Sequence, residues 1–269
     1  MTAPIRRFLS QLLPPVLTAG YRRHFRSVRF TGDYACWADA AAASAGYEAE
    51  NILQTVLAAA RQVRDGEAAY DRDGVVFAEP AHVWPVVAAL QRVAMKNRGE
   101  LRVLDFGGAL GSLYFQHRDL LADIGTLRWA VVEQPMFVAA GQREFTTDQL
   151  TFHPDIAAAV AATAPNVALL SGVVGWVEDP HALLEQIVAQ DFGAVLLDRC
   201  AIVPGPRDRL TVQQVPAAIY RASYPAWLMS REGICRHFAG RYELKTEFRG
   251  QDPVVDGVDF FGFHFERRA

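Results

Sequence analysis

Short apolar runs alternate with amphipathic stretches over the second half of the chain. The runs are rich in valine, leucine and phenylalanine, and helical periodicity fills most of the segments between them. Strands separated by helices are typical of a parallel sheet built from right-handed crossovers. The predicted parallel strands are Leu101–Phe106, Trp129–Val132, Leu150–Phe152, Val167–Leu170 and Ala194–Leu197.

The last two apolar runs are connected differently. Tyr242–Phe248 and Asp259–Phe265 are separated by a segment that contains Gly250, Pro253 and Gly257, and this segment is too short for a crossover helix. We therefore expect these two strands to pair antiparallel. The pattern as a whole predicts a Rossmann-like α/β fold.

The first part of the chain has mainly helical periodicity. Residues 35–66 and His82–Asn97 have apolar positions at helical spacing, and Tyr70–Gly74 has the composition of a turn. We expect an N-terminal helical extension or lid over residues 1–98, followed by one catalytic α/β domain over residues 99–269.

Composition and charge indicate an ordinary globular protein. Hydrophobic residues make up 51% of the chain, charged residues make up 21%, and the net charge is −3. This mild acidity argues against nucleic acid as a partner, because phosphate contacts need a concentrated positive field. The cysteines Cys36, Cys200 and Cys235 are few and widely spaced, so neither a disulfide framework nor a zinc cluster is indicated.

The N-terminus is basic and amphipathic. Six arginines precede the first acidic residue, Asp33, and several of them flank apolar positions. Such a segment can rest on an anionic membrane surface, but a helix docked on its own domain, ended by Pro14-Pro15, is the favoured interpretation. The chain contains no long apolar run and no secretory signal pattern, so we expect a cytoplasmic protein.

A glycine-rich segment follows the first predicted strand. The sequence Asp105-Phe106-Gly107-Gly108-Ala109-Leu110-Gly111 places a turn where the next helix begins, and helix N-termini bind polar or anionic groups. The dinucleotide fingerprint needs glycine at position 106, which is Phe106. The pattern Asp-x-Gly-x-Gly-x-Gly of S-adenosylmethionine enzymes is met at Asp105, Gly107 and Gly111, with Ala109 in place of the middle glycine. A tight strand-to-helix turn that binds no ligand would need similar residues, so this alternative stays open.

The ends of the next strands add polar groups at the same edge of the predicted sheet. Glu133 directly follows the second strand, where a carboxylate can accept hydrogen bonds from both hydroxyls of a ribose, and Gln134 lies beside it. Asp155, after the third strand, is a candidate for the adenine amino group. Ser171, after the fourth strand, faces the methionine end of the cofactor. Together with Gly108, these residues form the predicted cofactor site.

Several segments resemble a family of bacterial methyltransferases that is associated with cell-surface polysaccharide gene clusters. The resemblance lies in Asp105–Gly111, Trp129–Gln134, Ser223–Trp227 and Tyr70–Gly74, and it spans most of residues 30–265. It implies the seven-stranded class I methyltransferase sheet, with the last strand antiparallel, and S-adenosyl-L-methionine as cofactor. The departure at Ala109 affects the fine geometry of the cofactor loop.

Candidate catalytic residues follow the fifth strand. Asp198 and Arg199 come at its carboxyl end, where either side chain can bind or deprotonate an acceptor. An ion pair that fixes the following loop, Pro204–Pro206, is an equally weighted alternative.

The segment Arg207–Trp227 combines hydrogen-bonding groups with aromatic rings, which suits sugar recognition. An ordinary helix and loop packed over the sheet would show the same mixture. The candidate substrate-binding residues are Gln213, Tyr220 and Tyr224.

These observations predict an S-adenosylmethionine-dependent methyltransferase that O-methylates a sugar or another small polar acceptor. The histidines His153, His181 and His237 lack the spacing of a metal site, so no metal is predicted. Two other classes stay open, which are an NAD(P)-dependent oxidoreductase and a catalytically silent binding protein on the same fold. The missing glycine at Phe106 argues against the first.

Overall fold

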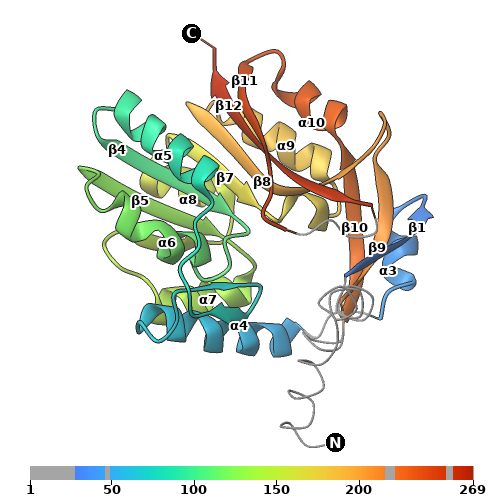
Figure 1. Ribbon diagram of the computed structural model, residues 1–269, viewed down its shortest axis with the longest axis horizontal. Helices are drawn as coiled ribbons and strands as arrows, with labels where there is room; N and C mark the ends of the chain where they lie inside the picture. The colour runs from blue at the N-terminus through green and yellow to red at the C-terminus, as the bar shows by residue number, and fades with distance from the viewer. Residues whose placement is uncertain (1–27, 46–48, 216–221, 253–256, 269) are drawn as a thin grey trace, which may run out of the picture.

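The computed structural model describes residues 28–45, 49–215, 222–252 and 257–268, and for residues 49–51 it describes the backbone alone. Five parallel strands form the centre of the main sheet in the order β6-β5-β4-β7-β8 (Figure 1). Each predicted parallel strand is confirmed. Helices cover both faces, which explains why the strands are apolar at nearly every position. The strands are β4 (Glu100–Phe106), β5 (Thr126–Val132), β6 (Leu150–His153), β7 (Val167–Ser171) and β8 (Ala194–Val203).

The antiparallel pair at the C-terminus is also confirmed. Strand β12 (Asp259–Arg267) pairs antiparallel with β8 on one side and with β11 (Tyr242–Arg249) on the other. These seven strands run in the order β6-β5-β4-β7-β8-β12-β11. The chain therefore has the mixed α/β, class I methyltransferase sheet that the sequence resemblance implies.

In the described part of the chain, three further strands, which the sequence did not predict, extend these seven to a ten-stranded sheet. Strand β9 pairs antiparallel with both of its neighbours, and we call the three strands the antiparallel wall. For the described residues of Arg207–Trp227 the alternative of a helix and loop is wrong, because Leu210 and Val212 alternate onto a small core with Ala40 while Thr211 donates a hydrogen bond across the pair. The wall consists of β1 (Arg29–Tyr34), β9 (Arg209–Val215) and β10 (Ala222–Ser230).

The antiparallel wall joins the main sheet at the carboxyl end of β8. Strand β7 pairs with β8 only as far as Asp198, and β10 pairs with it in parallel at Ile202 and Val203. Since β12 occupies the other edge of β8 as far as Ile202, β10 takes the edge that β7 leaves. The wall therefore lies beyond the carboxyl ends of the parallel strands.

A β-bulge interrupts β8 where the wall and the main sheet meet. Leu197 pairs with Phe263 and Cys200 pairs with Phe261, so two residues of β8 lie opposite one residue of β12. One of these two, Arg199, has a φ of 55°. Bulges bend a strand and redirect its side chains.

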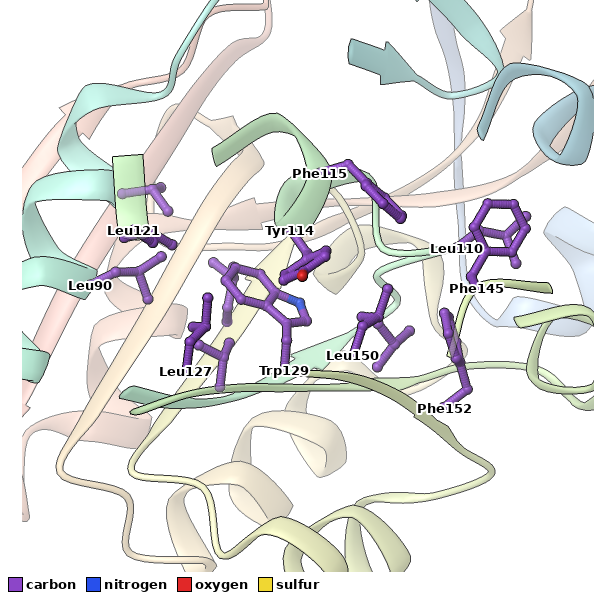
Figure 2. Close-up of a cluster of buried hydrophobic side chains, with 14 of the residues drawn as sticks. Leu90, Leu110, Tyr114, Phe115, Leu121, Leu127, Trp129, Phe145, Leu150 and Phe152 are labelled. Atoms are coloured by element: carbon purple, nitrogen blue, oxygen red, sulfur yellow. The ribbon is translucent and has the colours of Figure 1, made fainter. Parts of the chain in front are cut away.

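The first face of the sheet carries four helices around the largest core cluster. Trp129 is fully buried at its centre, and Tyr114 of α6 lies over it with the ring planes at 61° (Figure 2). Leu127 and Leu150 flank the indole on the neighbouring sheet positions (Figure 2). The elements on this face are α4 (Ala49–Arg64), α5 (Trp84–Lys96), α6 (Ser112–His117), the 3-10 helix η1 (Arg118–Leu121) and α7 (Pro135–Glu144).

The second face carries a further group of helices, whereas the short helix Trp37–Ala42 packs on the antiparallel wall. Val103 belongs to the first core and Leu104 to the second, because successive strand residues point to opposite faces. Phe238 stacks on Phe265 with the ring centroids 4.0 Å apart, which fixes the last helix against β12. The elements here are α8 (Ile156–Thr163), the 3-10 helix η2 (Val174–Trp176), α9 (Pro180–Ala189) and α10 (Arg231–Phe238).

Residues 28–98 are less helical than predicted. Helices α3 (Trp37–Ala42), α4 and α5 are present, but β1 pairs with β9, and strands β2 (Tyr70–Arg72) and β3 (Val75–Phe77) form a hairpin. The predicted turn is the two-residue connection Asp73-Gly74, whose φ angles of 52° and 78° match a type I′ turn.

The expected N-terminal helix falls within residues 1–27, outside the described part of the chain, and the division at residue 98 stays a prediction. None of the helices in the described ranges is both long and apolar enough for a membrane span.

The packing of α7 on β6 leads to a stability prediction. A Cβ added to Gly141 would collide with the ring of Phe152, which is 2% exposed. Gly141→Ala should therefore lower the free energy of unfolding by about 1–2 kcal/mol, although alanine has the better helix propensity. Urea unfolding measures this change.

Gly240→Ala is the matched control, because a Cβ at Gly240 meets no atom within 4 Å. Its free energy of unfolding should stay within about 0.5 kcal/mol of the parent value. A stabilised Gly141→Ala variant would show that Phe152 does not pack against α7 in this way.

Candidate functional site

A cavity of about 1580 Å³ lies at the carboxyl ends of β4, β5, β7 and β8. The β2–β3 hairpin and α4 line a second side, and the antiparallel wall lines a third. In open α/β sheets, ligands bind at this edge beside the strands where the chain order reverses, which here are β4 and β7. Typical small-molecule sites measure roughly 300–1,000 Å³, so two ligands fit side by side.

Two glycines let the backbone approach a ligand in this cavity. Gly107 has a φ of 73°, and a Cβ there would lie 2.6 Å from the side chain of Val173. A Cβ on Gly108 would collide with the carboxyl group of Asp105. Ala109 has a φ of 51°, in the left-handed region that favours glycine, which gives the physical reason for a glycine at this position in the general pattern.

Asp105 lies under this turn and is 1% exposed. Its Oδ2 accepts a hydrogen bond of 2.9 Å from Trp129 Nε1. Burial raises the pKa of Asp105 to about 7, although the indole donor acts in the opposite direction. The side chain therefore stabilises the turn from below and lines the cavity.

Glu133 connects the glycine turn to the start of α7. Its Oε1 accepts a hydrogen bond from the backbone N–H of Ala109 at 3.3 Å, and its Oε2 accepts one from that of Gln134 at 2.7 Å. Burial raises the pKa of the Glu133 carboxyl. Each carboxylate oxygen retains a second lone pair, so Glu133 can still accept donors from a ligand, and both Glu133 and Gln134 line the cavity.

Two of the predicted cofactor residues lie at the edges of the site. Gly111 is the N-cap of α6 with a φ of 89°. Asp155 caps α8, where its Oδ1 accepts a hydrogen bond from the backbone N–H of Ala158 at 2.7 Å. Pro154 lines the cavity and Asp155 does not. The adenine contact of Asp155 stays a prediction.

Ser171 and Asp198 come together at the ends of β7 and β8. Ser171 Oγ donates a hydrogen bond of 2.8 Å to Asp198 Oδ2. Asp198 is 1% exposed, and its Oδ1 has no hydrogen-bond partner among the described residues. Burial raises the pKa of the Asp198 carboxyl. Both residues line the cavity.

Arg199 lies in the β8 bulge and forms ion pairs with two distant carboxylates. Its guanidinium donates to Asp252 at 2.9 and 3.2 Å and to Asp73 at 2.9 Å. The sequence left open an ion pair at Asp198 and Arg199. In the structure the acidic partners of Arg199 are instead Asp73 of the β2–β3 hairpin and Asp252 after β11. Burial lowers the pKa of Arg199, but the two carboxylates raise it more, so the side chain stays a cation.

The antiparallel wall presents a linked polar group at its cavity surface. Trp176 Nε1 donates to Gln213 Oε1 at 2.7 Å, and Gln213 Nε2 donates to Tyr224 Oη at 3.3 Å. All three residues line the cavity, so the structure brings the predicted Gln213 and Tyr224 together. Tyr220 lies outside the described residues.

The sequence analysis missed the acidic residues of the hairpin. Asp71 is 3% exposed, and its Oδ2 accepts a hydrogen bond of 3.1 Å from Ser112 Oγ of α6. Burial raises the pKa of Asp71 to about 6. The signal was present, since Asp73-Gly74 between Tyr70-Asp71-Arg72 and Val75-Val76-Phe77 is a hairpin pattern.

The histidines lie away from this arrangement. His181 Nδ1 is 2.7 Å from His237 Nε2, and His181 Nε2 is 2.7 Å from Asp208 Oδ2, which joins α9 and α10 to the start of β9. His153 shares a hydrogen bond with Thr151. None of these residues lines the described cavity.

The comparison with known proteins finds similarity in the fold alone. No protein family profile and no curated protein matches the chain. Magnesium protoporphyrin IX methyltransferase of Synechocystis, with bound SAH, is 17% identical over 68% of this chain and 81% of its own, with a TM-score of 0.46. The N-terminal domain of EvdMO1, with SAH and D-fucose, is 14% identical over 82% and 98%, with a TM-score of 0.46.

An S-adenosylmethionine-dependent methyltransferase of Clostridium acetobutylicum is 8% identical over 70% of this chain and 93% of its own, with a TM-score of 0.47. These TM-scores are below 0.5, so the similarities carry no argument about what this chain binds or does.

The burial of Asp105 leads to a pH prediction. An unfolded aspartate has a pKa of about 3.9, and the folded-state value is about 7. The folded protein thus holds a proton that the unfolded chain has lost, so this contribution to stability disappears as the pH rises through 7. From pH 5 to pH 8 the free energy of unfolding of the parent should therefore fall by roughly 3 kcal/mol more than that of Asp105→Asn.

Urea unfolding at a series of pH values measures this difference. Asp148→Asn, at an exposed position, is the control and should follow the parent protein. Parallel pH curves for the parent and Asp105→Asn would show that Asp105 is ionised in the folded state throughout this range.

Proposed function

We propose that the chain is an S-adenosylmethionine-dependent methyltransferase. The observation that carries this proposal is the position of Glu133, hydrogen-bonded to the glycine turn at the switch point of a class I sheet. A carboxylate at the end of this second strand is placed to accept hydrogen bonds from ribose hydroxyls, and the glycine turn leaves backbone uncovered for the rest of the cofactor.

The residues around the cavity fit this cofactor. A Cβ would fill the space at Gly107 and Gly108, and the buried carboxyl groups suit a ligand with a positive sulfonium and a positive amine. The residues proposed to bind the cofactor are Asp105, Gly107, Gly108, Gly111, Glu133, Gln134, Asp155 and Ser171.

Bound S-adenosylmethionine supplies a methyl group whose carbon bonds to the acceptor's lone pair while the carbon–sulfur bond breaks and its electron pair goes to sulfur. In our proposal Asp198 takes the acceptor's proton, because its Oδ1 has no partner among the described residues and burial raises its pKa. Arg199 stays charged, and its ion pairs with Asp73 and Asp252 hold the β2–β3 hairpin and the segment after β11 at the edge of the cavity.

We further propose that the group that receives the methyl is a hydroxyl of a sugar or of another small polar molecule. It is supported by the sequence resemblance and by the cavity positions of Gln213 and Tyr224, with Tyr220 as the third proposed substrate residue. We also propose that residues 1–98 act as the lid of the site, because the β2–β3 hairpin and α4 line the cavity.

Cofactor binding separates this function from its rivals. Glu133→Gln keeps the shape of the side chain and removes its charge, so it should weaken S-adenosylhomocysteine binding about 10- to 100-fold, the loss expected for one or two charge-assisted hydrogen bonds. Isothermal titration calorimetry measures the affinity.

The control is Glu232→Gln, on the exposed first turn of α10, which should bind like the parent. Titration with NADH runs in parallel. Binding of NADH without S-adenosylhomocysteine would favour an oxidoreductase, and binding of neither would favour a catalytically silent protein.

A further inference from the structure

The cavity carries an excess of negative charge. Among the described residues, six carboxyl groups line it against two guanidinium groups, an excess of four negative charges when all are ionised. A charged wall of one sign attracts ligands of the opposite sign, more strongly in a low-dielectric cavity than in water. The acidic lining residues are Asp71, Asp73, Asp105, Glu133, Asp198 and Asp252, and the basic ones are Arg72 and Arg199.

Both guanidinium groups are already committed to carboxylates of this chain. Arg199 binds Asp73 and Asp252, and Arg72 Nη1 lies 3.9 Å from Asp252 Oδ1. Arg72 also donates to Gln251 Oε1 at 3.3 Å. The ion pairs of these cations are therefore with Asp73 and Asp252, although the charge of Arg199 also lowers the pKa of the neighbouring Asp198.

Three buried carboxyl groups form no ion pair within the described part of the chain. Asp71, Asp105 and Asp198 are each no more than 3% exposed, and their hydrogen-bond partners are Ser112, Trp129 and Ser171. Asp198 Oδ1 has no partner at all among the described residues. A buried carboxylate without a cation is destabilising, so such a group either holds a proton or gains a positive partner from a ligand.

The cofactor accounts for only part of this charge. Asp105 lies under the glycine turn, where the cofactor would bind, and Asp71 contacts Ser112 next to that turn, whereas Asp198 belongs to β8, the strand that the antiparallel wall joins. The remaining surface is largely apolar, with Trp37 and Trp176 beside the wall and Phe77 on the hairpin. Aromatic rings also attract cations over their faces.

Building on the proposed function, we propose that the methyl acceptor is a cationic molecule, with a protonated amine bound by Asp71 and Asp198 and an apolar, ring-containing body against the antiparallel wall. An acceptor with a phosphate or carboxylate would meet unpaired carboxylates and is excluded. This narrows the small polar acceptor of the proposed function to one charge class.

A matched set of probes tests this charge preference. Phenethylamine, 2-phenylethanol and 3-phenylpropionate share a ring and differ in charge, and each is titrated calorimetrically into the protein with S-adenosylhomocysteine present. Burial raises the pKa of Asp71 to about 6, so the titration is done at pH 8, where its carboxylate is ionised. Phenethylamine should bind at least tenfold more tightly than 3-phenylpropionate, with 2-phenylethanol between them.

Two variants test which residues cause the preference for a positively charged probe. Asp71→Asn and Asp198→Asn should each weaken phenethylamine at least fivefold and leave 2-phenylethanol within twofold of the parent. Asp179→Asn, which alters an exposed cap of α9 outside the cavity, should change neither. Thermal unfolding of each variant separates a local effect from loss of the fold.

Several results would overturn the proposal. These are equal or tighter binding of 3-phenylpropionate, preference for 2-phenylethanol as for a sugar hydroxyl, no binding of phenethylamine at millimolar concentration, or variants that weaken amine and alcohol alike. The binding of S-adenosylhomocysteine is measured first, in a titration of its own. Its failure to bind would contradict the methyltransferase assignment, whereas the comparison of the three probes tests the charge preference.

Discussion

The bulge in β8 is the constraint on which the site depends. In a regular strand, Asp198 and Arg199 would point to opposite faces of the sheet, and only one of them would reach a given side. The extra residue opposite β12 and the left-handed backbone of Arg199 let both side chains line one cavity. Arg199 then reaches the hairpin and the segment after β11, while Asp198 stays in contact with β7 through Ser171.

The bulge also explains how hydrophobic packing and a polar cavity coexist at one strand. Leu197 and Cys200 both face the second core, on either side of the irregularity, so the apolar layer continues past it. Burying Asp198 beside that layer is unfavourable for a charge, and its raised pKa reflects this. The strain of a non-glycine residue at positive φ, of order 1–3 kcal/mol, is offset by the ion pairs that Arg199 forms with Asp73 and Asp252.

Periodicity was sufficient to predict the parallel strands and the final antiparallel pair, because each parallel strand contains a short apolar run and the last two strands are separated by a glycine- and proline-containing loop. It was insufficient for β9, where Thr211, Gln213 and Gln214 lie among the apolar residues and the partner strands are distant in sequence. The glycine turn and the strand ends that line the cavity could be predicted, since one local motif and the ends of the parallel strands determine their positions. The hairpin acids could not, because the burial of Asp71 depends on contact with Ser112, which is 41 residues away.

The attachment of the antiparallel wall has a consequence for how such a protein diversifies. Within the described ranges, only Ile202 and Val203 pair this wall with the main sheet, whereas the half that carries the glycine turn is held by the parallel strands and both cores. Replacement of wall residues therefore leaves the half that carries the glycine turn with its own support. The cavity-facing side chains of the wall can change independently of the parallel strands.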